Sequence, residues 1–220
     1  MNNKPLRLAV FASGTGTNFQ TIYRNILDGN LNAGIAGLIT NNPEAGALVF
    51  AEANNIPVEI INKKRFPEDG AVTEEILKTL QGWQPDLIVL AGYMKMLARK
   101  VVDAYPKRIV NIHPALLPSF GGKGMYGIHV HEAVIEHGVR FTGVTVHIVD
   151  YNYDTGPIIL QKIVPVQMDD TPATLQKRVL QEEYKIYTEA IRLFAENRIS
   201  FSGRRVIIQD YHAENQDSAH

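Results

Sequence analysis

Short apolar runs alternate with amphipathic segments along the first half of the chain, and this alternation restricts the fold more than any other feature. Buried strands are predicted at residues 6–12, 35–40, 57–61, 86–91 and 108–113. Helices are predicted between them, at residues 18–27, 45–54, 71–83 and 94–105. Strands that alternate with helices form right-handed βαβ units, so we expect an α/β fold with a doubly wound, mostly parallel, Rossmann-like sheet.

The pattern changes after residue 113. A proline- and glycine-rich loop is expected at residues 114–127, and a short helix around residues 131–137. Two strands at 141–150 and 157–166, joined by a turn, are predicted as antiparallel additions to the sheet. Thr171 and Pro172 form a helix start signal, and the helix is expected to run to about Asn197. A final strand is possible at 205–209, and disorder is expected at 213–220.

We therefore expect a single domain over residues 1–200 and a partly disordered tail over residues 201–220. The net charge is −1 with mixed signs along the chain, which argues against a nucleic-acid surface. There are no cysteines, so thiolate nucleophiles and cysteine-ligated metals are excluded, and a reducing cytoplasm fits. No targeting segment is expected, and no apolar run approaches the roughly 20 residues that cross a membrane.

The sequence SGTGTN at residues 13–18 lies between the first strand and the first helix. Glycines permit a tight turn there, and free N–H groups at a helix start favour an anion such as phosphate. A purely structural turn is the alternative. The third glycine of a dinucleotide motif is replaced by Phe19, and no Lys-Ser/Thr pair follows, so a phosphate monoester is the more natural ligand.

Asn111 and His113 end a predicted central strand, just before Pro114. Ligands bind outside the carboxyl ends of strands in such sheets. Strand alternation puts both side chains on one face, about 6–7 Å apart, where an amide and an imidazole can stabilise an oxyanion. Asp154 lies in the turn between the two later strands and can charge His113 and collect a proton if the turn folds back. Satisfied turn residues are the alternative in both cases.

Three further features leave alternatives open. Glu183 falls on the apolar stripe of the last long helix, so it either reaches the helix edge or faces a polar cleft. His129, His131 and His137 follow the glycine-rich loop, but no acidic residue stands at a familiar ligand spacing, so no metal is predicted. The apolar residues after Gly92 are either core or part of an aromatic cofactor's pocket.

With these segments in order, the chain resembles the phosphoribosylglycinamide formyltransferases, folate-dependent enzymes of purine biosynthesis. The resemblance covers residues 6–194 and rests on six ordered motifs: SGTGTN (13–18), LAGYMKML (90–97), NIHPALLPSF (111–120), VTVHIVD (144–150), DTGPII (154–159) and QEEYKIY (181–187). It implies a formyltransferase fold and transfer of the formyl group of 10-formyltetrahydrofolate to the amine of 5'-phosphoribosylglycinamide. It also implies direct attack through a tetrahedral oxyanion, without a metal.

The resemblance assigns roles to individual residues. Asn111, His113 and Asp154 match the catalytic trio. The acceptor's phosphate and ribose would be bound by Gly16, Thr17, Asn18 and Glu183. The folate would be bound by Met94, Lys95, Met96, Leu97, Asn111 and Asp150. Two departures from the family pattern stand out: Asp69 occupies a usually basic position near the folate tail, and residues 121–127 form a longer loop than usual.

Other functions remain possible from the sequence. A formyltransferase for methionyl-tRNA or a sugar amine and a formyltetrahydrofolate hydrolase are related alternatives, although we expect each tRNA or hydrolase relative to carry an extra domain. A non-catalytic nucleotide-binding module and a histidine-based metal hydrolase are alternatives of other classes. Small-molecule partners are expected, without nucleic acid or membrane, in a monomer or homodimer.

Overall fold

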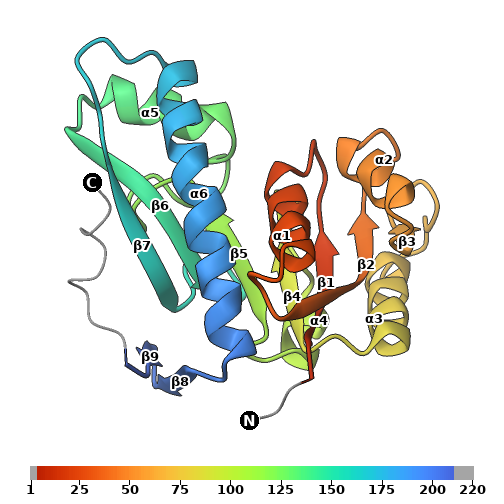
Figure 1. Ribbon diagram of the computed structural model, residues 1–220. Coiled ribbons are helices and arrows are strands. Elements are labelled where there is room, and N and C mark those ends of the chain that lie inside the picture. The colour runs from red at the N-terminus through yellow and green to blue at the C-terminus, as the bar shows by residue number, and fades with distance from the viewer. Residues whose placement is uncertain (1–3, 211–220) are drawn as a thin grey trace.

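The structure is a computed structural model that describes residues 4–210. Its main sheet has seven strands: β1 (Leu6–Phe11), β2 (Ala33–Thr40), β3 (Val58–Ile60), β4 (Leu87–Leu90), β5 (Ile109–His113), β6 (Phe141–Ile148) and β7 (Ile158–Pro165). The helices are α1 (Thr17–Leu27), α2 (Gly46–Ala53), α3 (Ala71–Trp83), α4 (Arg99–Ala104), α5 (Ile128–Glu136) and α6 (Pro172–Ala195). A hairpin of β8 (Ile199–Ser202) and β9 (Arg205–Ile208) follows α6 (Figure 1).

The strand order in the main sheet is β3-β2-β1-β4-β5-β6-β7. Strands β1 to β5 pair in parallel, whereas β5 with β6 and β6 with β7 pair antiparallel. The predicted mostly parallel sheet with antiparallel additions in the C-terminal half is therefore confirmed.

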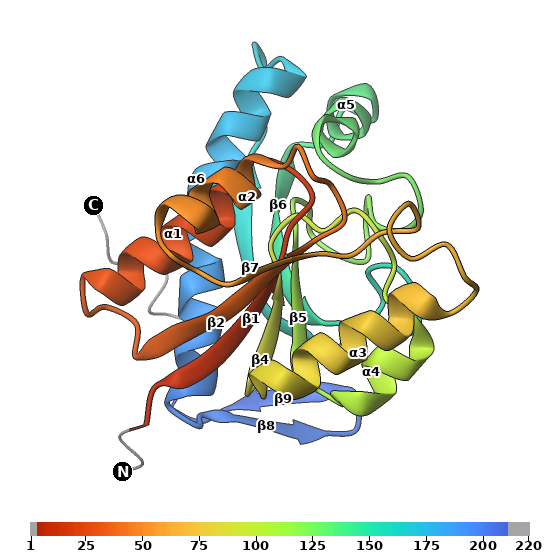
Figure 2. The ribbon, with the colours of Figure 1, turned by 90° about the vertical axis from the view of Figure 1, so that its right-hand side faces the viewer.

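The helices cover both faces of the sheet because alternate residues of β1 point to opposite sides. Leu8 and Val10 pack in clusters that include residues of α1, α2 and α6, whereas Ala9 and Phe11 pack against α3 and α4. Figure 2 shows α1 and α2 on one side of the sheet and α3 and α4 on the other. Burial on both faces explains why β4 is apolar at every position.

The strand order reverses its direction at β1. The chain runs from β1 outward to β2 and β3, and then returns through α3 to β4 on the other side of β1. The carboxyl ends of β1 and β4 therefore diverge into loops that lead away from each other. A crevice at such a reversal is the usual ligand site of an open α/β sheet.

The long helix α6 begins as the sequence predicts. Thr171 caps it, and the side chains of Thr171 and Thr174 each accept from the other residue's backbone N–H, with Pro172 in the first turn. Further along, Tyr187 is fully buried, and its hydroxyl lies 3.0 Å from the Leu90 carbonyl and 3.1 Å from the Val110 carbonyl. This hydroxyl connects α6 to β4 and β5.

Two predicted elements differ in the structure. The helix expected at residues 94–105 forms only over Arg99–Ala104, because the N–H of Met94 donates to the Ser13 hydroxyl and holds residues 92–98 as a loop. Strand β8 is absent from the sequence prediction, although it pairs with the predicted β9. The disorder expected at 213–220 lies outside the described residues. No helix within residues 4–210 is long and apolar enough to span a membrane.

Candidate functional site

A cavity of about 660 Å³ opens at the carboxyl ends of the parallel strands. Its walls come from the loop after β1, the loop after β4, the end of β5, the turn between β6 and β7, residues 122–127 and one side of α6. The cavity therefore lies at the crevice that the strand order predicts. It includes most of the polar residues that the sequence selects.

The glycine loop brings the start of α1 to the cavity. Gly16 is the N-cap with φ 72°, and a Cβ atom there would lie 2.7 Å from the Cβ of Ala47. Only glycine meets both the left-handed backbone and the close contact with α2. No side chain within residues 4–210 caps α1, so the N–H groups of Thr17 and its neighbours in the first turn are left for a ligand.

Asn18 and Glu183 meet across the cavity, although they are far apart in the sequence. The amide of Asn18 donates to the Glu183 carboxylate at 2.8 Å, and the buried Oδ1 of Asn18 has no hydrogen-bond partner among the residues that the structure describes. Burial raises the pKa of Glu183, and the hydrogen bond from Asn18 opposes that rise. Glu183 thus faces a polar cleft, which was one of the two alternatives for this carboxylate.

The turn between β6 and β7 folds back over the end of β5 and brings Asp154 to His113. Asp154 Oδ2 lies 3.6 Å from His113 Nδ1 and accepts a hydrogen bond from the Gly122 N–H at 2.9 Å. The other imidazole nitrogen of His113, Nε2, donates to the Phe120 carbonyl at 2.8 Å. Asp154 has φ 57°, a left-handed conformation that Asp and Asn tolerate better than most residues.

Burial and the neighbouring carboxylate have opposite effects on the charge of His113. Burial lowers the pKa of His113, and this effect outweighs the opposing influence of Asp154. Burial also acts to raise the pKa of Asp154, but His147, His113 and the Gly122 N–H together hold that pKa below its ordinary value. Burial and Asp154 thus act in opposite directions on the pKa of His113, and the idea that Asp154 keeps His113 cationic stays a prediction.

His147 belongs to the same cluster and is absent from the sequence prediction. It pairs with Asn111 across β5 and β6, and it is 2% exposed. Its Nδ1 donates to the Ile148 carbonyl, so its Nε2 is the acceptor for the Asn111 amide at 3.2 Å. The same Nε2 lies 3.6 Å from Asp154 Oδ1. Asp154 is thus flanked by two imidazoles.

The residues proposed for folate binding do not all reach the cavity. Met94 and Asn111 line it, whereas Lys95, Met96, Leu97 and Asp150 do not. Leu97 packs in the core with residues of α3 and α4. The carboxylate of Asp150 accepts from Thr155 and Asn152 and so stabilises the turn that carries Asp154.

The three histidines after the glycine-rich loop have separate environments. His129 is exposed and contacts Glu132, His131 is buried beside the cavity, and His137 contacts the Ala133 carbonyl. Within residues 4–210, no group of three or more His, Asp or Glu side chains is arranged to hold a metal ion. The histidines therefore do not form a shared ligand set.

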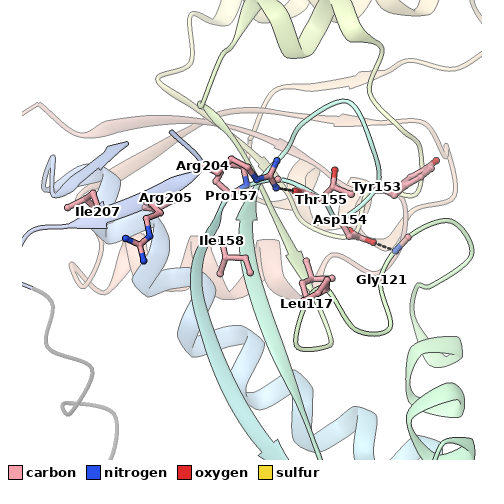
Figure 3. Close-up of a pocket in the computed structure, with 14 residues that line it drawn as sticks. Leu117, Gly121, Tyr153, Asp154, Thr155, Pro157, Ile158, Arg204, Arg205 and Ile207 are labelled. Atoms are coloured by element: carbon pink, nitrogen blue, oxygen red, sulfur yellow. Dashed lines mark hydrogen bonds between the residues drawn. The ribbon is translucent and has the colours of Figure 1, made fainter. Parts of the chain in front are cut away.

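A second, larger hollow of about 910 Å³ lies beside the same turn (Figure 3). It is lined by residues 153–158, by Arg204 and Arg205 of the terminal hairpin, and by Leu117. Arg204 donates to the Thr155 carbonyl, which attaches the hairpin to the turn. Neither Asn111 nor His113 lines this hollow, so the smaller cavity is the candidate for the chemistry.

Comparison with known proteins agrees with this geometry. The sequence profile described as "Formyl transferase" matches residues 6–191. The chain is 47% identical over 196 residues to the chloroplastic phosphoribosylglycinamide formyltransferase of Arabidopsis thaliana, covering 89% of this chain and 67% of that protein. It is 37% identical over 186 residues to the phosphoribosylglycinamide formyltransferase of Bacillus subtilis, covering 84% and 93%.

A solved structure is also similar over almost the full length. Glycinamide ribonucleotide transformylase 1 from Symbiobacterium toebii has a TM-score of 0.88 and 39% identity, covering 96% of both chains. The chain spans about two thirds of the length of the plant relatives, at 62–67%.

Proposed function

The chain belongs to the formyl transferase family, and we propose that it transfers the formyl group of 10-formyltetrahydrofolate to the amine of 5'-phosphoribosylglycinamide. The observation that carries this proposal is the convergence of an amide, an imidazole and a carboxylate in one cavity, beside an uncapped helix start. The first three groups suit formyl transfer, and the helix start suits the acceptor's phosphate. The relatives named above support this choice of acceptor.

We propose that the acceptor lies between the start of α1 and His113. Its phosphate binds the N–H groups of Gly16, Thr17 and Asn18, and its ribose or amide contacts Glu183. The hydrogen bond from Asn18 holds the Glu183 carboxyl at the cavity, which supports this contact. Burial raises the pKa of Glu183, and the same hydrogen bond opposes that rise. The glycinamide amine then reaches the end of β5.

The donor enters from the loop after β4. Formyltetrahydrofolate is the co-substrate, with its pterin against Met94 and the backbone of the turn that includes Asp150. The three residues that follow Met94 do not line the cavity, and we propose that they support the folate-binding part of its wall from behind: Lys95, Met96 and Leu97. Two hydrogen bonds of Ser13 support this arrangement. Its N–H donates to the Gly92 carbonyl and its hydroxyl accepts from the Met94 N–H, so the loop after β1, proposed for the acceptor, is joined to the loop after β4, proposed for the folate.

The reaction follows from the groups around the formyl carbon. The neutral amine attacks, a C–N bond forms, and the formyl oxygen becomes an oxyanion. Asn111 has one N–H bonded to His147, which leaves its second N–H for that oxygen. Loss of one such donor typically raises the barrier by about 2.7–4 kcal/mol.

Proton transfer completes the exchange. The amine proton passes, through water, to Nδ1 of His113, where Asp154 stabilises the new imidazolium. That cation stabilises the oxyanion until the bond to the folate nitrogen breaks. The leaving nitrogen then takes the proton and keeps the electron pair, so atoms and charges balance. The lowered pKa of His113 supports this order, because burial favours the neutral imidazole that can accept the proton.

The direct test is formylation of 5'-phosphoribosylglycinamide with 10-formyltetrahydrofolate in the presence of a chelator. We expect turnover without added metal. Turnover of a different amine, with none of this acceptor, would keep the family but reject the acceptor. Release of formate without an acceptor would favour the hydrolase alternative.

Asp154→Asn is the sharpest variant, because Asn also tolerates the left-handed backbone and keeps the shape of the side chain. We expect turnover to fall roughly 100-fold or more, because the imidazolium loses its counter-charge. Binding of the acceptor, measured by calorimetry, should change little. Asp169→Asn, an exposed carboxylate elsewhere, is the matched control. Near-normal turnover of Asp154→Asn would reject the assigned role.

The remaining assignments are proposals of the same kind. We propose small molecules as the partners, a monomer or homodimer as the assembly, and the cytoplasm as the location. The plant relatives are named chloroplastic, so location is best tested directly by fractionation of cells that produce the protein.

A further inference from the structure

The proposed acceptor carries a phosphate with a charge between about −1.5 and −2 at pH 7. The described residues that line the cavity include two carboxyl groups, Asp154 and Glu183, and a single lysine or arginine, Lys123. The N–H groups at the start of α1 supply about half a positive charge. Helix and backbone alone therefore leave most of the phosphate charge without a counter-ion.

Lys123 lies in the loop at residues 121–127, which is the segment that departs from the family pattern. Its neighbours Gly122 and Gly124 have φ 98° and 91°, and a Cβ atom at either would meet no other atom within 4 Å. The loop therefore turns sharply on both sides of Lys123 in open space. Such a backbone lets a long side chain cover the mouth of the cavity.

The base of this loop is fixed, whereas the lysine side chain is not. The Gly122 N–H donates to Asp154, so the residue before Lys123 is attached to the reacting carboxylate. Lys123 itself is exposed and makes no hydrogen bond or ion pair with the residues that the structure describes. Its ammonium group is therefore available to a ligand in the cavity.

We propose that Lys123 is the counter-ion of the acceptor's phosphate and makes the cavity select a phosphorylated acceptor. The inference rests on the proposed function and adds a residue and a loop to it. The phosphate is held from two sides, by the start of α1 and by the ammonium group from the loop. Charge-assisted contacts of this kind are among the strong hydrogen bonds of proteins.

The test measures binding without the folate, so that chemistry plays no part. Calorimetry compares 5'-phosphoribosylglycinamide with its dephosphorylated counterpart, using the wild-type protein, Lys123→Met and Lys177→Met. Lys177 is an exposed residue of α6 outside the cavity lining, so it is a matched control. We expect Lys123→Met to weaken binding of the phosphorylated compound roughly tenfold or more, with binding of the dephosphorylated compound unchanged.

Two additional measurements make the result specific. Lys123→Arg should restore most of the affinity, because it keeps the charge. The ratio of the affinities for the phosphorylated and dephosphorylated compounds should fall with added salt in both proteins. The fall should be larger for the wild-type protein than for Lys123→Met. Equal weakening of both compounds, or no weakening of either, would overturn this inference and leave the proposed function standing. A wild-type protein that binds neither compound would overturn both.

Discussion

At the scale of single residues, the hydrogen bonds near Asp154 determine which side-chain nitrogens of His147 and Asn111 donate and which accept. The Ile148 carbonyl can only accept, so His147 has its proton on Nδ1 and presents a bare Nε2 to Asn111. That contact orients the Asn111 amide with its N–H groups, rather than its oxygen, towards the cavity. The proposed role of Asn111 as an oxyanion donor therefore depends on a buried histidine outside the cavity lining.

This dependence predicts a contrast between two variants of His147. His147→Asn removes the acceptor at the Nε2 position, and we expect kcat to fall roughly tenfold or more with KM for the acceptor little changed. His147→Gln can return an acceptor to about that position and should retain more activity. A purely structural role would instead lower stability in both variants and leave kcat per folded molecule unchanged, which urea unfolding would detect.

A second residue-scale prediction concerns acid stability. Burial and the neighbouring His113 lower the pKa of His131 from 6.5 to about 4. The unfolded chain therefore binds a proton at this residue before the folded protein does, so stability is lost as the pH falls between these values. We expect a contribution of about 2 kcal/mol between about pH 7.5 and pH 5.

Urea unfolding at the two pH values checks this contribution. His131→Gln keeps a polar side chain that does not titrate, so its stability should fall less than that of the wild-type protein over the same range. Equal losses in the two proteins would contradict the lowered pKa.

The residues of the site were predictable to different degrees. Asn111 and His113 follow from strand alternation alone, because both stand on one face at the end of β5. His147 has no comparable signal, since it looks like one more residue of an alternating buried strand. Its partnership with Asn111 depends on the register between β5 and β6, which is set by packing across the whole sheet.

At the scale of elements, the turn between β6 and β7 decides where Asp154 lies. A Cβ atom at Gly156 would lie 1.7 Å from the Ile148 carbonyl oxygen, so no other residue fits without movement of the turn. The sequence predicts the turn, but no local pattern encodes its position over the end of β5.

Gly156→Ala tests the importance of this close approach. The turn must shift, and Asp154 shifts with it, so we expect kcat to fall roughly 100-fold, as for misplacement of a reactive group by about 1 Å. Gly82→Ala is the control, because a Cβ atom there meets nothing within 4 Å. Unchanged kcat in Gly156→Ala, measured on folded protein, would show that the turn has room to adapt.

The loop after β4 shows where local sequence patterns fail. Residues 94–98 have apolar residues at helical spacing, yet they form a loop because Ser13 takes the N–H of Met94. Such a contact joins residues 81 positions apart, and no local pattern contains it. The strand β8 shows the opposite case, because its short alternation at Ile199 and Phe201 is a local pattern.

At the scale of the whole molecule, the cavity is closed by a helix that comes late in the chain. The Tyr187 hydroxyl attaches α6 to the carbonyls of Leu90 and Val110 in the centre of the sheet. The single hydroxyl hydrogen is within reach of both carbonyl oxygens, so this contact contributes to holding α6 against strands that come much earlier.

Tyr187→Phe should therefore lower the free energy of unfolding by about 0.5–1.5 kcal/mol, because the hydrogen bond that the hydroxyl donates to a backbone carbonyl is lost. Urea denaturation measures the change, and Tyr184→Phe, on the same helix, is the control. The formyltransferase assay on folded protein should show a smaller effect than for Asp154→Asn. A stability equal to that of the control would contradict this account of how α6 is held.

The placement of Glu183 on α6 also has an evolutionary consequence. The proposed reacting groups come from β5 and the turn between β6 and β7, whereas the proposed contact to the acceptor comes from a helix on another wall of the cavity. Mutations on one turn of α6 can therefore change the accepted amine without altering the formyl-transfer groups. Descendants of such a protein could diversify in substrate while inheriting one chemistry intact.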